Sequence, residues 1–400
     1  MTEARRVGTP RRSGTFAVAA VCVAMLVDML LYSVVVPVLP VYARELGAST
    51  AAIGLLFAVY AVGLVLATPI LGMLSDRIGR RRPMLVGSFG LVAATILFAM
   101  ADSYSLLVTA RFVQGVAAAA VWTAGVALVA EVTDARNLGK VMGVVMACMS
   151  AGLIIGPPVG GLLEQAGDHR TPFLVVAVVA VLSGLTQFFF IHDPVRGGGA
   201  TARVRVLLAD PVLRSTVIAV FLASAALSML EPILPLDLTT RLAAGPVVIG
   251  LVFGAATLAN GATSPLAGML ADRYPRGRRR LMAGGLLAAG ALMPTLIILD
   301  TPIGVAGVLS VFAIAYGFVL VPALPELAVV AQRHGGGAYA AVYGTFNIVY
   351  SLGMAVGPLA GGVGAEWSLS GTLALAGIVL GVGGLLLLYT PRRERPANFR

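Results

Sequence analysis

Twelve apolar segments, each near the length that a helix needs to cross a membrane, follow one another along this chain of 400 residues. A spanning helix takes about 20 residues, because each residue adds about 1.5 Å across a hydrocarbon core of about 30 Å. Hydrophobic residues make up 58% of the chain and charged residues 12%, too few to cover a water-soluble surface. We therefore predict an all-α membrane protein. The expected spans cover residues 16–40, 50–73, 84–101, 105–131, 139–163, 171–191, 213–238, 247–270, 281–299, 303–330, 338–364 and 369–389.

The basic residues predict how the chain is oriented. If the N-terminus is cytoplasmic, 24 of the 28 lysines and arginines fall in cytoplasmic segments and three in outer loops. One, Arg111, is left inside a span. We expect both termini in the cytoplasm of a bacterium, and a multi-pass protein of its plasma or inner membrane. The net charge of +10 then reflects topology, and we expect no nucleic-acid partner.

The two halves of the chain repeat each other. PVLP at residues 37–40 recurs as PILP at 232–235, and GPPVGG at 156–161 recurs as GPLAGG at 357–362. Repeats in the same orientation predict two six-helix bundles related by an axis along the membrane normal, an architecture of transporters. The predicted parts are a bundle over residues 1–192, a cytoplasmic linker over 193–212 and a bundle over 213–400.

A glycine and arginine motif lies between the second and third spans. It reads Gly72-x-x-x-Asp76-Arg77-x-Gly-Arg-Arg and resembles the cytoplasmic loop signature of the major facilitator superfamily. Glycine lets helix ends approach closely, and Arg77 needs an acidic partner, for which Glu131 at the end of span 4 is the candidate. We expect these residues to form a gate latch that breaks when the halves move. The alternative is an arginine loop that only sets topology.

The fifth span carries a second motif. SAGLIIGPPVGGLL, residues 150–163, resembles the span-5 signature of proton-driven drug exporters in that superfamily. Its glycines permit tight packing, while its prolines weaken the helix backbone. The alternative is an ordinary packing face of small residues. The motif residues are Gly152, Gly156, Pro157, Gly160 and Gly161.

Nearly the whole chain resembles the vesicular amine transporters and their bacterial drug-exporting relatives. The resemblance rests on stretches such as LVDMLLYSVVVPVLP, MLEPILP and YAAVYGTFNIVYSLGMAVGPLAGG. It implies the major facilitator fold. It also implies that a span-1 aspartate, here Asp28, and a span-7 glutamate, here Glu231, handle a cationic substrate. The arginine of the span-4 motif Arg-x-x-Gln-Gly falls on Arg111.

The chain departs from the eukaryotic carriers at several positions. Their span-2 lysine falls on Tyr60 and its span-11 aspartate partner on Asn347, so both members of that ion pair are missing together. Their span-10 aspartate falls on Leu320. These departures favour a prokaryotic multidrug or amine exporter over a neurotransmitter carrier.

The acidic residues within the spans are also informative by themselves. Asp28 lies near the middle of span 1, where a carboxylate is costly unless it is wet, paired or protonated. The alternative is a structural aspartate bonded to its neighbours. Glu231 precedes Pro232 and is either functional or close to the interface. Glu326 is either functional or a solvated helix end.

Aromatic residues at helical spacing extend this candidate site. Tyr32 lies four residues from Asp28, and Tyr350 three from Asn347. Such rings, with that of Tyr60, can hold an organic cation by cation–π contact. The alternative is that they serve only as packing or interface residues.

These observations predict a proton-coupled antiporter that exports small organic cations or amphiphilic drugs and amines by alternating access. We expect a functional monomer that is driven by the proton gradient without a cofactor. Cys22 and Cys148 lie in apolar runs and are interpreted as small hydrophobic residues, with no metal site. A uniporter or symporter for a neutral or anionic solute is the alternative. We find no nucleophile–base pair or phosphate loop, and so do not expect an enzyme.

Overall fold

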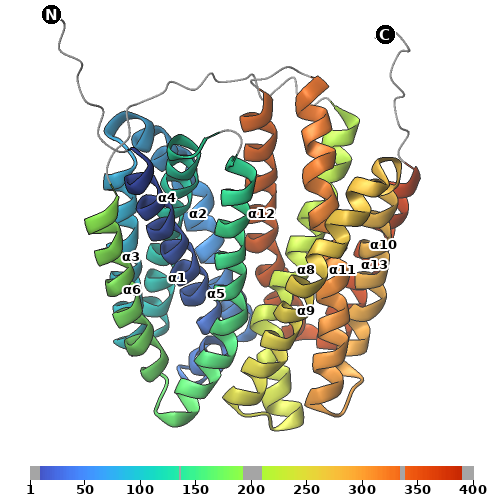
Figure 1. Ribbon diagram of the computed structural model, residues 1–400. Coiled ribbons are helices and arrows are strands. Elements are labelled where there is room, and N and C mark those ends of the chain that lie inside the picture. Colours follow the sequence, from blue (N-terminus) through green and yellow to red (C-terminus); the bar gives the residue numbers. More distant parts are fainter. Residues whose placement is uncertain (1–9, 135–136, 192–209, 334–337, 390–400) are drawn as a thin grey trace, which may run out of the picture. The chain divides into compact units, whose positions relative to one another are not determined.

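The computed structural model describes residues 10–134, 137–191, 210–333 and 338–389 (Figure 1). Twelve helical segments in these residues are long and apolar enough to cross a membrane, which confirms the predicted all-α membrane fold. Most of the expected linker and both chain termini lie outside the described residues, so the orientation stays a prediction. The helices are α1 (Pro10–Glu45), α2 (Thr50–Ile78), α3 (Arg81–Ala99), α4 (Tyr104–Val132), α5 (Leu138–Ala166), α6 (Thr171–Phe190), α8 (Pro211–Leu242), α9 (Pro246–Arg273), η1 (Pro275–Gly277), α10 (Arg278–Leu292), η2 (Met293–Ile297), α11 (Pro302–Arg333), α12 (Ala338–Trp367) and α13 (Leu369–Tyr389).

The ninth span differs from its prediction as a single helix. It runs as α10 and then as the 3-10 helix η2, which begins at Met293. Pro294 has no backbone N–H to continue the α-helical bonding, so the last turns tighten. The other spans are single helices, and α1, α8 and α11 extend well past the roughly 20 residues that a bilayer requires.

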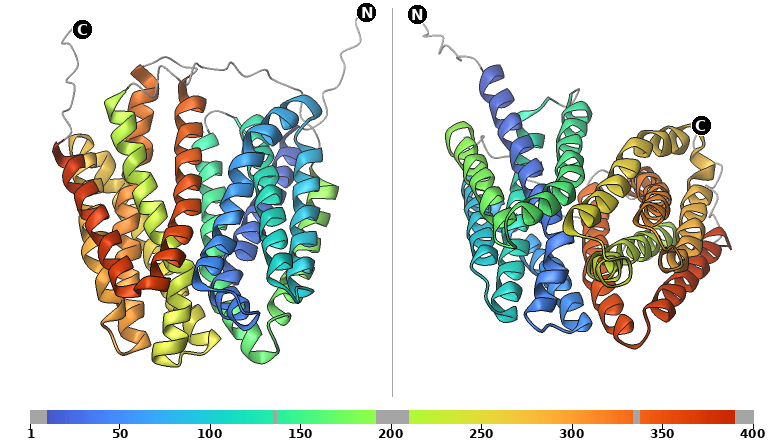
Figure 2. Two further views of the ribbon diagram at one scale, coloured as in Figure 1. Left: turned by 180° about the vertical axis from the view of Figure 1, so that it is seen from behind. Right: turned by 90° about the horizontal axis from the view of Figure 1, so that it is seen from below.

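The helices group into two compact units (Figure 2). In the first unit, α1 packs against α4, α5 and α6, and α3 packs against α4 and α6. In the second unit, α8 packs against α11, α12 and α13, and α10 packs against α11 and α13. The same spans therefore meet in the same order, as a parallel repeat requires. The first unit comprises Met1–Ser49, Val59–Gly198 and Ala243–Gly254, and the second Thr50–Ala58, Gly199–Leu242 and Ala255–Arg400.

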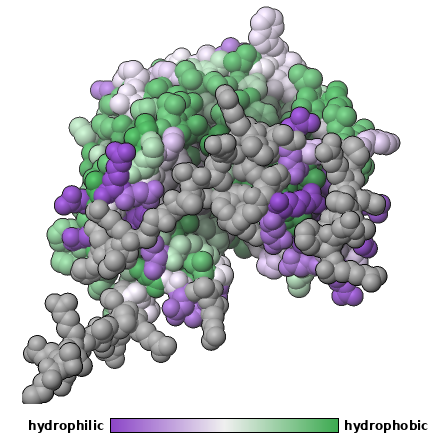
Figure 3. Space-filling view, turned by 90° about the horizontal axis from the view of Figure 1, so that it is seen from above, coloured by the Kyte–Doolittle hydropathy of each residue, from purple (hydrophilic) through white to green (hydrophobic). Residues whose placement is uncertain are grey.

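Two ends can be defined within each unit. We call the end with the arginine-rich α2–α3 or α9–α10 connection the proximal end, and the opposite one the distal end. Figure 3 is a view from above, in which hydrophilic side chains lie among hydrophobic ones. This is the distribution expected where spanning helices leave hydrocarbon for water.

One interface is built in the same way in both units. The Ser33 hydroxyl of α1 donates to the Gly152 carbonyl of α5 at 3.2 Å, and the Ser228 hydroxyl of α8 donates to the Gly353 carbonyl of α12 at 3.3 Å. A Cβ atom on Gly152 would collide with the Leu26 carbonyl oxygen. Absent side chains thus let the backbones approach, and a serine bridges them.

Candidate functional site

Asp28 is a buried acid to which the described part of the chain offers no partner. Its side chain lies on α1 and is 1% exposed. Neither of its carboxylate oxygens has a hydrogen-bond partner among the described residues. An ionised carboxylate in such a place is unfavourable, so a bound proton or a cation would stabilise it. The predicted alternative, a structural aspartate bonded to its neighbours, is wrong for this structure.

Arg111 lies in the same unit, against the rings of two neighbouring tyrosines. Its guanidinium carbon is 5.3 Å from the ring centroid of Tyr32 and 5.0 Å from that of Tyr60. The two rings are themselves 5.0 Å apart. Arg111 also donates to Gln114 at 2.7 Å, and the Gln114 amide donates to the Leu31 carbonyl at 3.2 Å. The structure therefore brings three predicted site residues together. The cation that contacts the two tyrosine rings is the guanidinium of Arg111, not a substrate.

The second unit holds a group of aromatic residues and an acid that interacts with one of them. The hydroxyls of Tyr316 on α11 and Tyr350 on α12 are 3.1 Å apart, and the Phe346 ring stacks on Tyr350 with centroids 6.2 Å apart. Glu231 on α8 is half-buried and interacts electrostatically with Tyr350. Asn347, in contrast, is exposed and makes no hydrogen bond with described residues. The sequence analysis missed Tyr316 and Phe346, although Phe346 lies four residues before Tyr350 on one helix face.

Glu326 is a buried acid of this unit. It is 5% exposed and has no hydrogen bond or ion pair within the described residues, so the alternative of a solvated helix end is wrong. The neighbouring Pro325 carbonyl accepts a hydrogen bond from Arg278 at 3.2 Å. Leu327 belongs to an apolar cluster with Val212. Glu326 thus lies buried in the part of α11 that is near the proximal end.

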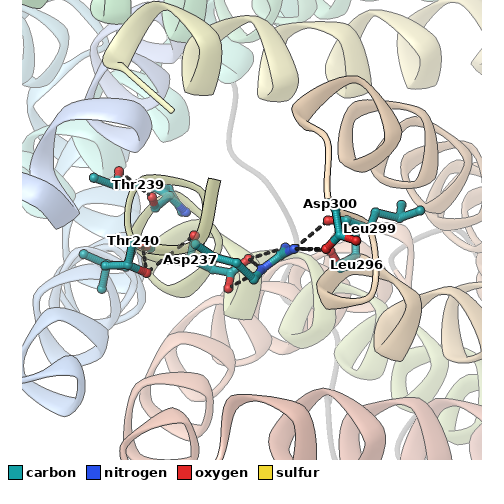
Figure 4. Close-up of polar contacts among 9 residues, drawn as sticks. Asp237, Thr239, Thr240, Leu296, Leu299 and Asp300 are labelled. Atoms are coloured by element: carbon teal, nitrogen blue, oxygen red, sulfur yellow. Dashed lines mark hydrogen bonds and ion pairs between the residues drawn. The ribbon is translucent and has the colours of Figure 1, made fainter. Parts of the chain in front are cut away.

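A third acid of this unit, Asp237, has a structural role (Figure 4). Its carboxylate accepts hydrogen bonds from Arg241, one turn along α8, at 2.7 and 3.1 Å. Arg241 also donates to the Leu299 carbonyl at 2.5 Å and to the Leu296 carbonyl at 3.4 Å. The ion pair therefore joins the distal end of α8 to the turn between η2 and α11.

The arginine motif of the first unit uses a different arginine from the one predicted. Arg80 donates to Glu131 at 2.7 and 2.9 Å and to Asp76 at 2.6 Å, while Arg77 is exposed and forms no ion pair with described residues. Gly79 turns the chain at the end of α2 with φ of +96°. Arg80 therefore points back over α2, one turn from Asp76, and reaches α4.

Two further details concern this motif. A Cβ atom on Gly72 would meet nothing within 4 Å, so close helix approach does not explain this glycine. In the second copy, Arg278 donates to the carbonyls of Ala271 and Pro325 at 2.9 and 3.2 Å, and lies 3.9 Å from Asp272. Arg80 and Arg278 therefore have similar positions in the two copies. Among the described residues, Arg80 alone of the two forms an ion pair with a carboxylate outside its motif, that of Glu131 on α4.

We predict that Arg80→Ala lowers the free energy of unfolding by about 1 kcal/mol or more, because three hydrogen bonds to carboxylates are lost. Arg77→Ala is the matched control and should change it by less than about 0.5 kcal/mol. Thermal unfolding of the purified protein measures both. Equal losses in the two variants would contradict the assignment of Arg80 as the linking residue.

The span-5 motif packs against two helices. Gly152, Gly156 and Gly160 face the α1 backbone, as the collisions of an added Cβ atom show. A Cβ atom on Gly161 would instead collide with the Pro246 carbonyl at the start of α9. The Pro157 carbonyl is likewise met by a Cβ placed on residue 250 of α9. All five motif residues therefore lie where backbones approach closely within the first unit.

Across the described residues, twelve apolar helices, a parallel repeat and buried acids that make no hydrogen bond there are the features of a membrane transporter. A family model of the Major Facilitator Superfamily matches residues 21–217 and 216–400, and the chain belongs to this superfamily. The resemblance found in the sequence is confirmed by known proteins. The chain is 31% identical to the probable vesicular acetylcholine transporter-B of Danio rerio, over 96% of this chain and 79% of that protein.

Two further comparisons extend this result. The chain is 28% identical to the chromaffin granule amine transporter of Rattus norvegicus, over 85% of this chain and 64% of that protein. A crystal structure of a bacterial homologue of the human lysosomal transporter Spinster matches with a TM-score of 0.79 at 16% identity, over 98% and 100% of the two chains. That structure supports the fold. The protein is thus a multi-pass major facilitator transporter related to the vesicular amine transporters.

Proposed function

We propose that this transporter is a proton-coupled antiporter that exports small organic cations, either amines or amphiphilic drugs. The observation that carries the proposal is the Asp28 carboxylate, which is 1% exposed and has no partner among the described residues. A proton or an organic cation can neutralise this group. The names of two relatives, which specify acetylcholine and amine transporters, favour a cationic substrate.

Competition for a carboxylate supplies the coupling in this proposal. A protonated acid no longer attracts a cation, and an acid that holds a cation no longer binds a proton. Protons from one side load Asp28 or Glu231 and release the substrate, and proton loss to the other side restores the carboxylate. Since one group cannot hold both, movement of one species requires counter-movement of the other.

The aromatic residues support a place for the substrate. In the first unit, Arg111 already lies against the rings of Tyr32 and Tyr60. In the second unit, Glu231 interacts electrostatically with Tyr350, whose hydroxyl lies 3.1 Å from that of Tyr316. A carboxylate with aromatic faces suits a quaternary or protonated amine. We therefore propose that the organic cation binds at Asp28 or Glu231, with nearby aromatic rings, and competes there with a proton for the carboxylate.

Proteoliposomes with an acidic lumen and a trapped pH-sensitive dye test this function. The probes are acetylcholine and ethidium, whose permanent charge prevents them from carrying protons through lipid. An antiporter should raise the lumenal pH when probe is added outside, and protein-free liposomes should not respond. Probe uptake with lumenal acidification would instead indicate symport, and uptake without any pH change would indicate uniport. Either result would overturn the proposal.

A further inference from the structure

The only two cysteines of the chain are brought together by the fold. Cys22 lies on α1 and Cys148 on α5, and both are free thiols. The two thiols lie close enough to interact with each other electrostatically. Cys22 is buried, whereas Cys148 is only half-buried. From the sequence alone, these positions are interpreted as two separate small hydrophobic residues. The structure shows instead that the two thiols form a pair.

The pair continues the regular contact between α1 and α5. Along this interface, each turn of α1 meets a glycine of α5, with backbone close to backbone. Cys22 and Cys148 each lie four residues before the first of these contacts, on the same rows. A disulfide requires Cα atoms about 4.4–6.8 Å apart, and helices can approach that closely only where small residues separate them. The contacts are Leu26 with Gly152, Leu30 with Gly156, and Val34 with Gly160.

The equivalent positions of the second unit show which side chains are sufficient for packing at this interface. The repeat offsets of 195 residues for α1 and 201 for α5 place Val217 and Val349 where the first unit has its cysteines. Both valines belong to one packed apolar cluster. Two aliphatic side chains therefore satisfy the same interface. Sulfur at both positions of the first unit adds a chemistry that packing does not require.

We propose that Cys22 and Cys148 form a redox modification site, at which peroxide closes a disulfide between α1 and α5. Peroxide oxidises the more accessible Cys148 thiol to a sulfenic acid and releases one water. The Cys22 sulfur then attacks that sulfur, forms the S–S bond and releases a second water. Two thiols and one peroxide thus give one disulfide and two waters. A thiol reductant reverses the reaction.

Thiol counting tests this site on the purified full-length protein in lipid nanodiscs. After treatment with hydrogen peroxide, the protein is denatured and its free thiols are labelled with a maleimide. We expect both thiols to be lost together, the intact mass to fall by two hydrogen atoms, and dithiothreitol to restore both. Independent oxidation of each thiol to sulfinic acid, or a cross-link between two chains, would overturn the proposal.

Two variants control for geometry. Cys148→Val combined with Ala147→Cys moves the thiol to the adjacent, exposed position of α5, about 100° around the helix, and should abolish the cross-link. The double variant Cys22→Val and Cys148→Val uses the residues of the second unit and should fold normally. If a cysteine at position 147 formed the disulfide as efficiently as Cys148, the cross-link would reflect chance collision of thiols, which would contradict the proposed site. The count involves no transport, so failure of the proposed antiport would leave it unaffected.

Discussion

Asp28→Asn should lower the substrate-driven proton flux by at least about tenfold, which corresponds to a free-energy difference of roughly 1.4 kcal/mol. Asparagine keeps the size of the side chain but cannot bind and release a proton. The wild-type carboxylate is 1% exposed and makes no hydrogen bond with the described residues, so the variant breaks no observed hydrogen bond and should fold. The measurement is the lumenal pH of proteoliposomes after addition of acetylcholine or ethidium.

Asp102→Asn is the matched control for this experiment. Asp102 is an exposed acid in the connection between α3 and α4, and its replacement should leave the proton flux unchanged. If Asp28→Asn exchanged protons for substrate at the wild-type rate, Asp28 would not be the coupling residue. A loss of folded protein in this variant, seen by size-exclusion chromatography, would instead contradict the absence of a structural role.

Gly152→Ala should destabilise the protein by about 1–3 kcal/mol, the usual cost of forcing an extra carbon into a well-packed core. The added Cβ atom would collide with the Leu26 carbonyl oxygen and lie 3.0 Å from the Leu30 nitrogen. These are backbone atoms of α1, which cannot rotate away as a side chain could. The helices would have to separate, weakening the Ser33 bond to the Gly152 carbonyl. Thermal unfolding of the purified protein measures the effect.

Gly143→Ala provides the control on the same helix. A Cβ atom at Gly143 would meet nothing within 4 Å, and alanine favours helix, so stability should be unchanged or slightly increased. The repeat supplies a second check, because Gly353→Ala meets the Phe221 carbonyl at 2.7 Å in the second unit. Equal stability of the Gly152 and Gly143 variants would refute the proposed packing role.

The spanning helices were predictable because lipid imposes a simple one-dimensional rule. A helix in hydrocarbon needs an apolar run of nearly fixed length, so hydropathy alone located all twelve. Asp28 stood out by the same rule, as a charge at the middle of such a run. The repeat was visible because equivalent spans meet equivalent neighbours and so keep similar packing residues.

Contacts between helices were not predictable in the same way. The choice of Arg80 over Arg77 depends on the left-handed turn at Gly79, which redirects the chain by a single residue. The tyrosine pair of Tyr316 and Tyr350 depends on how α11 and α12 are rotated against each other. Neither feature leaves a periodic signal in the sequence.

The sequence by itself determined the membrane fold and the repeated halves, and it identified an acid near the middle of an apolar run. Only the tertiary structure decided which side chains meet, as for Cys22 with Cys148 or Arg111 with Tyr60. The physical reason is that burial in lipid depends on the composition of each helix alone. A contact depends on the rotation and register of two helices, and a shift of one residue turns a side chain by about 100°.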